Sequence, residues 1–200
     1  ETCDFTVEVV DTAKPNSITC GAQANSAGVA AATEEAVSSD GTAVVYWSAT
    51  SATDLGYAAN TLTISYADSN GTAVTSGGDS FSIAEHTITA KALDGSGNFE
   101  TCTFNVEVVD TAKPNDITCG QQTNSAGANA ATEEATSDDG ATVYWSATTA
   151  MDVGYLDSGL TISYTADLGN GNGSETVVTG QDTFAIGEHT VTAKALGGGR

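Results

Sequence analysis

Cysteine thiols are the residues of this sequence with the most defined chemistry. Cys3 and Cys20 lie in one stretch, ETCDFTVEVVDTAKPNSITCG, and Cys102 and Cys119 lie in its near copy at residues 100–120. Four cysteines in a chain rich in Thr, Ser and Gly indicate an oxidising compartment, where thiols form disulfides. We therefore expect the protein to be extracellular or exposed at a cell surface.

The four cysteines allow three pairings. A Cys20–Cys102 bond would join the first and last strands of one domain, which commonly lie side by side in a sandwich. The alternative, Cys3–Cys20 with Cys102–Cys119, would bridge an extended connector that separates its cysteines by more than the ~7 Å between Cα atoms that a disulfide tolerates. The first pairing is favoured, and it leaves Cys3 and Cys119 with partners outside the chain or in a neighbouring subunit.

Carboxylates flank both copies of the connector. Hard cations such as calcium take about 6–8 oxygen ligands, largely carboxylate and carbonyl groups. Asp54 and Asp152 could join from a loop at the same end of each domain, although the spacing is not that of an EF-hand and solvated surface charge is the competing interpretation. Calcium is the one cofactor that the sequence suggests, and its candidate ligands are Glu8, Asp11, Glu107, Asp110 and Asp116.

The remaining polar residues do not indicate catalysis. His86 and His189 are the only histidines, one in each repeat, whereas a catalytic or zinc site needs several converging ligands. No serine lies in a nucleophile elbow, and no glycine-rich phosphate loop precedes a helix. We therefore expect a protein that is not an enzyme.

Two sequons occupy the same variable hairpin of the two repeats. Asn70-Gly-Thr and Asn172-Gly-Ser both match the acceptor pattern for N-glycosylation. The shared position favours glycosylation over chance, so we expect a glycoprotein wherever the secretory pathway glycosylates.

Strands must position these groups, because almost no segment has a helical period. Cys102, Phe104, Val106 and Val108 alternate with polar residues, which is the period of a half-buried strand. Pro114 then stiffens the connector to the next strand. Short strands separated by Gly, Asn and Asp turns predict an all-β fold of tandem β-sandwiches.

The repeat divides the chain. Its offset is 99 residues at the cysteines and 103 at the histidines, because the loop at 167–183 is longer in the second copy. We expect one sandwich at 11–110 and a second at 111–200 that lacks its own closing strand. Residues 1–10 have the sequence of such a strand. When the last residues of the chain are joined to the first, the resulting sequence resembles the one in the middle of the chain that contains the closing strand of the first sandwich. The predicted assembly strand carries Cys3, Phe5, Val7 and Val9 on one face.

The amino-acid composition indicates which classes of molecule the protein is not expected to bind. The net charge is −21, from 26 acidic and 5 basic residues, which argues against nucleic acid and anionic membranes. No apolar run is long enough to span a membrane. Surface carboxylates of this number suit a hydrated extracellular protein.

The order of motifs resembles hyalin-repeat (HYR) domains, which are extracellular immunoglobulin-like modules found in tandem. The resemblance rests on the two Ile-Thr-Cys openings, the Tyr-Trp strands, the His-Thr-Ile/Val-Thr-Ala strands and the stretch at 101–106. Lys-Pro replaces the double proline that is usual in the connector. The resemblance implies immunoglobulin-like sandwiches and a role in cell adhesion or matrix rather than catalysis.

The leading functional hypothesis is a structural repeat unit of an extracellular filament or matrix fibre. Its partner would be the protein itself, as a head-to-tail assembly or a continuous repeat polypeptide, and a free monomer is not expected. The alternative is an adhesin stalk or receptor ectodomain that binds a glycan or matrix protein through its loops, where Tyr57 and Tyr155 are the aromatic candidates.

Overall fold

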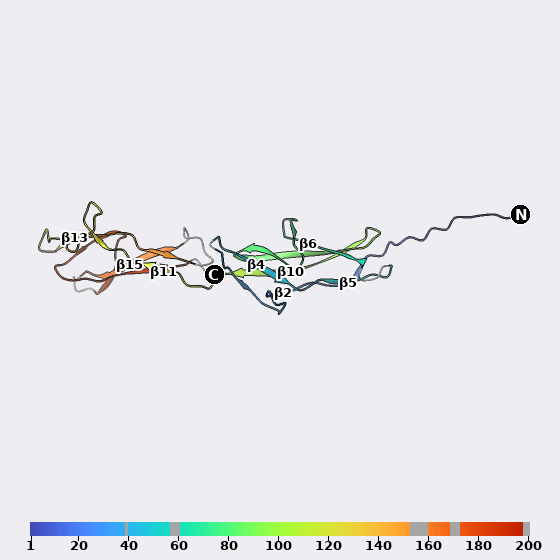
Figure 1. Ribbon diagram of the computed structural model, residues 1–200, viewed down its shortest axis with the longest axis horizontal. Helices are drawn as coiled ribbons and strands as arrows, with labels where there is room; N and C mark the ends of the chain where they lie inside the picture. The colour runs from blue at the N-terminus through green and yellow to red at the C-terminus, as the bar shows by residue number, and fades with distance from the viewer. Residues whose placement is uncertain (39, 57–60, 153–159, 169–172, 198–200) are drawn as a thin grey trace. The chain divides into compact units, whose positions relative to one another are not determined.

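The computed structural model describes residues 1–38, 40–56, 61–152, 160–168 and 173–197 (Figure 1). Its regular structure is almost entirely β, as predicted. The chain forms two compact units. Unit 1 comprises Glu1–Ala36 and Thr42–Val109, and unit 2 comprises Val37–Gly41 and Asp110–Arg200. No helix in the described part of the chain is long and apolar enough to cross a membrane.

Unit 1 contains three sheets. The largest has the strand order β3-β10-β9-β6-β7, a second has the order β2-β4-β8, and β1 pairs with β5. The bounds of these strands are β1 Asn16–Thr19, β2 Gln23–Ala24, β3 Glu34–Glu35, β4 Thr42–Trp47, β5 Ser51–Thr53, β6 Thr63–Ala67, β7 Ala73–Val74, β8 Gly78–Ser82, β9 Ala84–Leu93 and β10 Phe99–Val109.

The core of unit 1 lies between these sheets. Val45 and Trp47 from β4 pack in one cluster with Ile88 from β9 and with Val106 and Val108 from β10. Each of these side chains is the inward member of an alternating strand, as the sequence predicts. The disulfide joins Cys20 to Cys102, with an S–S distance of 2.09 Å and a Cα–Cα distance of 5.8 Å. This is the pairing that the sequence favoured.

Unit 2 repeats most of this plan. Its sheets have the orders β11-β14, β12-β13-β17 and β16-β15-β18. The bounds are β11 Asn115–Thr118, β12 Gln122–Thr123, β13 Ala141–Trp145, β14 Thr149–Met151, β15 Thr161–Asp167, β16 Ser174–Thr176, β17 Gln181–Phe184 and β18 Val191–Leu196. Trp145 packs with Tyr164, Ala166, Val177 and Phe184 in a smaller core.

Unit 2 differs from unit 1 beside β18. In unit 1, β9 pairs with β6 on one side and with β10 on the other. Within the described residues of unit 2, β18 pairs with β15 alone. β9 is 10 residues long and β18 only 6, because the first part of β9 bonds only to β10. His189, which the sequence aligned with a strand residue, therefore precedes the strand.

Two further segments refine the sequence interpretation. Residues 22–41, which have no clear hydrophobic period, contain β2 and β3, and β3 pairs with β10 in parallel. Residues 1–10, here called the arm, contain no strand, and every residue in them is exposed. Figure 1 draws the arm as an extended chain that ends at the N-terminus.

Candidate functional site

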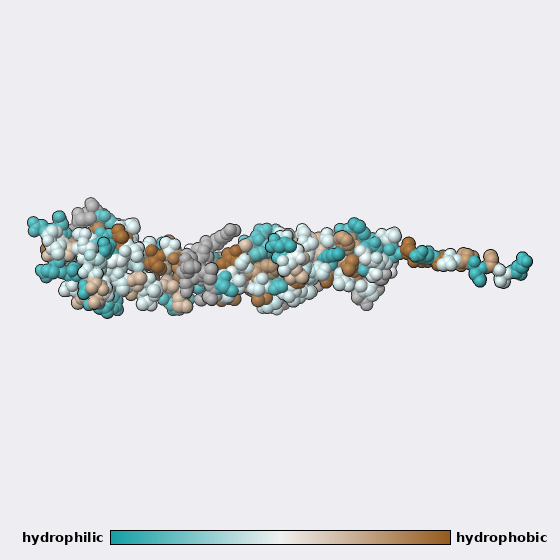
Figure 2. All heavy atoms as spheres, turned by 90° about the horizontal axis from the view of Figure 1, so that it is seen from above, coloured by the Kyte–Doolittle hydropathy of each residue, from teal (hydrophilic) through white to brown (hydrophobic). Residues whose placement is uncertain are grey.

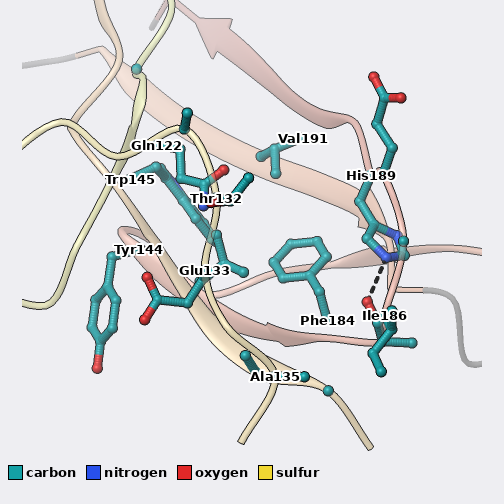
Figure 3. Close-up of a pocket in the computed structure, with 18 of the residues that line it drawn as sticks. Gln122, Thr132, Glu133, Ala135, Tyr144, Trp145, Phe184, Ile186, His189 and Val191 are labelled. Atoms are coloured by element: carbon teal, nitrogen blue, oxygen red, sulfur yellow. Dashed lines mark hydrogen bonds between the residues drawn. The ribbon is translucent and has the colours of Figure 1, made fainter.

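A cavity of about 700 Å³ opens into the core of unit 2. Figure 3 shows Trp145, Phe184 and Val191 around this cavity, with Thr132 and Glu133 beside them. Its floor is therefore the apolar core, and its edge is the segment that follows β12. We call the cavity, together with the unpaired side of β18, the open edge.

β10 and β3 occupy the corresponding place in unit 1. Val106 and Val108 of β10 are each 1% exposed and belong to the core cluster. The ring of Phe104 lies 6.0 Å from that of Trp47 and 6.4 Å from that of Tyr66, between ring centroids. Unit 2 has matching residues for the tryptophan and the tyrosine, but no described strand of unit 2 supplies the phenylalanine and valines.

Residues at equivalent positions in the two units show which side chains β10 covers in unit 1. Ile88 is 0% exposed, whereas the equivalent Val191 is 36% exposed. Ala36 is buried beside β10, and its amide donates to the carbonyl of Val109, whereas the equivalent Ala135 is exposed. Since both members of each pair are apolar, the difference in burial follows from β10, which has no counterpart among the described strands of unit 2.

A glutamine lies beside β10 in unit 1, and its equivalent lies at the open edge of unit 2. The side chain of Gln23 is buried, its Nε2 donates to the carbonyl oxygen of Glu107 at 3.0 Å, and its Oε1 accepts from the amide of Glu107 at 2.8 Å. This side chain therefore bonds the backbone of β10 in both directions. The equivalent Gln122 lines the open edge (Figure 3). Neither glutamine was singled out from the sequence, because each lies in a segment without a clear period.

The histidines have structural contacts. The ring of His189 lies within hydrogen-bond distance of the carbonyl oxygens of Asp167 (2.7 Å) and Ala185 (2.9 Å) and packs 5.2 Å from Phe184. His86 makes the matching contacts with the Ser82 carbonyl and with Phe81. These contacts place the rings at the rim of each core, without a second histidine or a nucleophile among their bonded partners.

The arm carries exposed apolar side chains and a free thiol, and the open edge has an apolar floor and a free thiol. Phe5 is 85% exposed, Val7 72% and Val9 93%, and Figure 2 shows hydrophobic side chains along this segment. Cys3 is a free, exposed thiol on the same face of the sequence pattern. Cys119, the other free thiol, lines the open edge. Among the described residues, β18 therefore has one side without a strand partner, and the arm is an apolar segment without a strand partner.

Three carboxylates converge in unit 1. Ligand oxygens of Asp11, Asp54 and Asp94 all lie within 4.8 Å of one another. One oxygen each of Asp11 and Asp54 is buried without a hydrogen-bond partner. Asp94 is only 5% exposed and begins the turn that follows β9. Gly56 leaves room beside them, since a Cβ there would meet the carboxylate of Asp11 and displace it.

Asp94 is held as a carboxylate. Burial raises its pKa, but hydrogen bonds from the Asn98 side chain and from the backbone amides of Asn98 and Ser96 outweigh burial, so the pKa lies below its usual value. Negative charges on carboxylates this close repel one another, and a cation between them would offset the repulsion. Oxygen ligands of this kind suit calcium.

The other predicted cation ligands lie elsewhere. Glu8 is in the exposed arm, Glu107 lies opposite Glu85 in the β9–β10 ladder, and Asp116 is exposed with a φ of 48°. Asp110 is 2% exposed, and its Oδ1 accepts from the amide of Ala112. Among the described residues, Asp11, Asp54 and Asp94 form the group of three, so only Asp11 of the five predicted ligands belongs to it.

One of the two glycosylation candidates lies in a described hairpin, between β6 and β7. Asn70 is exposed in a turn that Asp68 stabilises by accepting from the amides of Asn70 and Thr72. Such a position leaves the Asn70 side chain accessible to a glycan. Asn172, and the loop tyrosines Tyr57 and Tyr155, lie outside the described residues.

Comparison with known proteins adds one match. The family model described as HYR domain matches residues 10–108. This stretch covers unit 1 from the end of the arm to the penultimate residue of β10 and agrees with the resemblance seen in the sequence. No curated protein matches the chain. HYR domains are non-catalytic β modules of an extracellular, adhesion-type kind.

Proposed function

Since residues 10–108 belong to the HYR domain family, we propose that the chain is a structural repeat unit of an extracellular filament or matrix fibre. Copies join head-to-tail, and the arm of one copy supplies the closing strand of unit 2 in another. The partner is the protein itself, either as separate subunits or as successive repeats of one polypeptide. No catalytic step is involved.

The observation that carries the proposal is the open edge of unit 2. Its apolar floor and its unpaired strand correspond to surfaces that β10 covers in unit 1. An unpaired strand edge beside an open apolar cavity is a template for another strand, and adding a strand from a second chain is a recurring mode of assembly.

The arm fits this position by sequence. Residues 1–10, ETCDFTVEVV, align with residues 100–109 of β10, ETCTFNVEVV, and differ only at Asp4 and Thr6. Both differences fall on the outward face, at the positions of the exposed Thr103 and Asn105. The inward face of β10 is therefore retained without change in the arm.

Binding of a glycan or matrix protein through the loops, as in an adhesin stalk or receptor ectodomain, is the alternative function. It predicts monodisperse particles that bind their ligand without self-assembly. Electron microscopy of the purified chain separates the two, since the filament proposal predicts polymers with a regular axial repeat.

Two substitutions in the arm sharpen this test. Val7→Asp puts a charge on the inward face, at the position of the buried Val106, and should abolish assembly measured by sedimentation velocity. Thr6→Asp adds the same charge one residue away on the outward face and should leave assembly intact. Because the arm has no strand partner in the free chain, neither change should alter the melting of the two units. Equal assembly by both variants would contradict the proposal.

We also propose that Asp11, Asp54 and Asp94 bind a calcium ion in unit 1. Support comes from the close approach of the three carboxylates and from the buried oxygens of Asp11 and Asp54 that accept no hydrogen bond. Buried polar atoms of this kind ordinarily have a partner. Isothermal titration with calcium tests the proposal directly, with Asp54→Asn as the variant expected to lose binding.

A further inference from the structure

We propose that Cys3 of one copy and Cys119 of a second copy form an interchain disulfide that locks the docked arm in a single register. This inference rests on the proposed function, because the two thiols meet only if the arm enters the open edge. It makes the junction covalent in an oxidising compartment and gives both free cysteines of the chain a role.

The register follows from the β9–β10 ladder. In unit 1, Cys102 lies opposite Ala90, Phe104 opposite Ile88 and Val106 opposite His86. The repeat offsets convert these pairs into Cys3 opposite Ala193, Phe5 opposite Val191 and Val7 opposite His189. Phe5 then lies opposite Val191, which is 36% exposed. A shift by one residue would turn the whole apolar face outward.

The thiol geometry follows from the same template. Cys20 and Cys102 are bonded in unit 1 across the junction between the first strand and the closing strand. Cys119 holds the place of Cys20, lines the open edge and is a free, exposed thiol. With the arm in the register of β10, Cys3 holds the place of Cys102. The Cα–Cα distance at the junction should therefore approach the 5.8 Å of Cys20–Cys102, which suits a disulfide.

Gln122 is a second contact that fixes this register. Gln23 bonds both backbone groups of Glu107, and the residue of the arm that corresponds to Glu107 is Glu8. Gln122 is thus positioned to bond the amide and the carbonyl of Glu8 when the arm docks. Two anchors five residues apart, at Cys3 and Glu8, leave only one alignment that satisfies both.

The covalent step needs an oxidant. The Cys3 thiolate attacks a small disulfide such as oxidised glutathione, forms a mixed disulfide and releases one glutathione thiolate. The Cys119 thiolate then attacks the Cys3 sulfur, releases the second glutathione and forms the interchain bond. Two thiols lose two protons and two electrons, and one molecule of oxidised glutathione becomes two of reduced glutathione.

The test uses the full chain incubated with oxidised glutathione. Denaturing gels without reductant should show a ladder of covalent oligomers that collapses to monomer on reduction. Peptide mapping should recover Cys3 joined to Cys119, with Cys20 still joined to Cys102. Sedimentation of the same samples in native buffer measures assembly independently of the bond.

Complementary variants assign the bond to two copies. Cys3→Ser and Cys119→Ser should each give no ladder, because each retains only one of the two thiols. Their mixture should give a covalent dimer and nothing larger, since one variant supplies only the arm thiol and the other only the thiol of the open edge. Asp4→Cys in the Cys3→Ser background moves the thiol to the outward face, and it should give less than one tenth of the wild-type ladder.

Three results would overturn the lock. One is a mixture of the two single variants that stays monomeric on the gel. Another is a wild-type product with a different bond, either a monomer with Cys3 bonded to Cys119 of the same chain or a dimer held by a Cys3–Cys3 bond. The third is assembly in native buffer without any covalent product, which would leave the proposed function standing. Absence of assembly in native buffer would overturn both.

Discussion

Ile88 and Val191 hold equivalent positions in the two repeats, yet Ile88 is 0% exposed and Val191 is 36% exposed. Ile88 lies in β9, which pairs with β6, and Val191 lies in β18, which pairs with the equivalent strand β15. The difference arises on the other side, where Ile88 lies opposite Phe104 and no described residue lies opposite Val191. The exposure of Val191 therefore reflects the lack of a described strand on that side of β18, which is the position that the proposed assembly fills.

The two tryptophans should respond differently to truncation. Trp47 contacts the rings of Tyr66, Phe81 and Phe104, whereas the ring partners of Trp145 among the described residues are Tyr164 of β15 and Phe184 of β17. Trp47→Ala should destabilise unit 1 by about 3–5 kcal/mol, because it leaves a large cavity in a closed core. Trp145→Ala should cost about 1–2 kcal/mol less in the unassembled chain, because its site is already open. Calorimetry measures both, and a loss under about 1 kcal/mol for Trp47→Ala would contradict the packing.

Removal of the Cys20–Cys102 bond should affect unit 1 alone. The bond closes a loop with a sequence separation of 82, and chain entropy then assigns it about 4–5 kcal/mol of stabilisation. The Cys20→Ser, Cys102→Ser double variant should lower the denaturant midpoint of unit 1 and leave that of unit 2 unchanged. When single molecules are stretched, long extensions from unit 1 should occur at low force only in this variant or after reduction. A wild-type chain that extends fully without reduction would contradict this expectation.

Calcium should raise the melting temperature of unit 1. Binding to the folded state alone stabilises it by about 2.7 kcal/mol at a calcium concentration 100 times the dissociation constant. Asp54→Asn should abolish this effect, whereas Asp116→Asn should not, because Asp116 lies outside the group of three carboxylates. A melting curve that is the same in calcium and in excess chelator would argue against the cation site.

Assembly should strengthen as the salt concentration rises. The docked register places Glu8 opposite Glu188, as Glu107 lies opposite Glu85, and like charges directly across a ladder repel. The chain also carries a net charge of −21, so each junction brings two acidic molecules together. Screening between 50 and 300 mM salt shortens the reach of this repulsion. Sedimentation velocity should show larger species at the higher concentration, and Glu8→Gln should reduce the dependence on salt.

Much of the fold could be predicted from the sequence because the repeat is internally consistent. Alternation in residues 102–108 predicted β10, and the internal repeat predicted that unit 2 lacks such a strand. The cation group was only partly found. Its members come from three separate segments, and Asp94 has a sufficient local explanation as a turn residue that bonds Ser96 and Asn98.

The open edge itself could be predicted only in outline. The volume of the cavity depends on the positions of β13, β17 and β18 relative to one another. Local sequence patterns do not determine these positions. The signal that could have found its glutamine is comparison of the repeats, since Gln23 and Gln122 both follow their Cys-Gly pair at the same distance. A polar residue retained in both copies of a core-facing segment indicates a backbone contact.

Hydrogen exchange at β18 tests the central claim most directly. Half of a sheet-edge strand's amides face away from its only partner and exchange readily unless a second strand covers them. Under assembling conditions, the amides of Val191–Leu196 that do not bond to β15 should become protected in the wild type and in Thr6→Asp. The same amides should stay unprotected in Val7→Asp. Assembly of the wild type without any gain of protection in Val191–Leu196 would contradict completion of unit 2 by the arm.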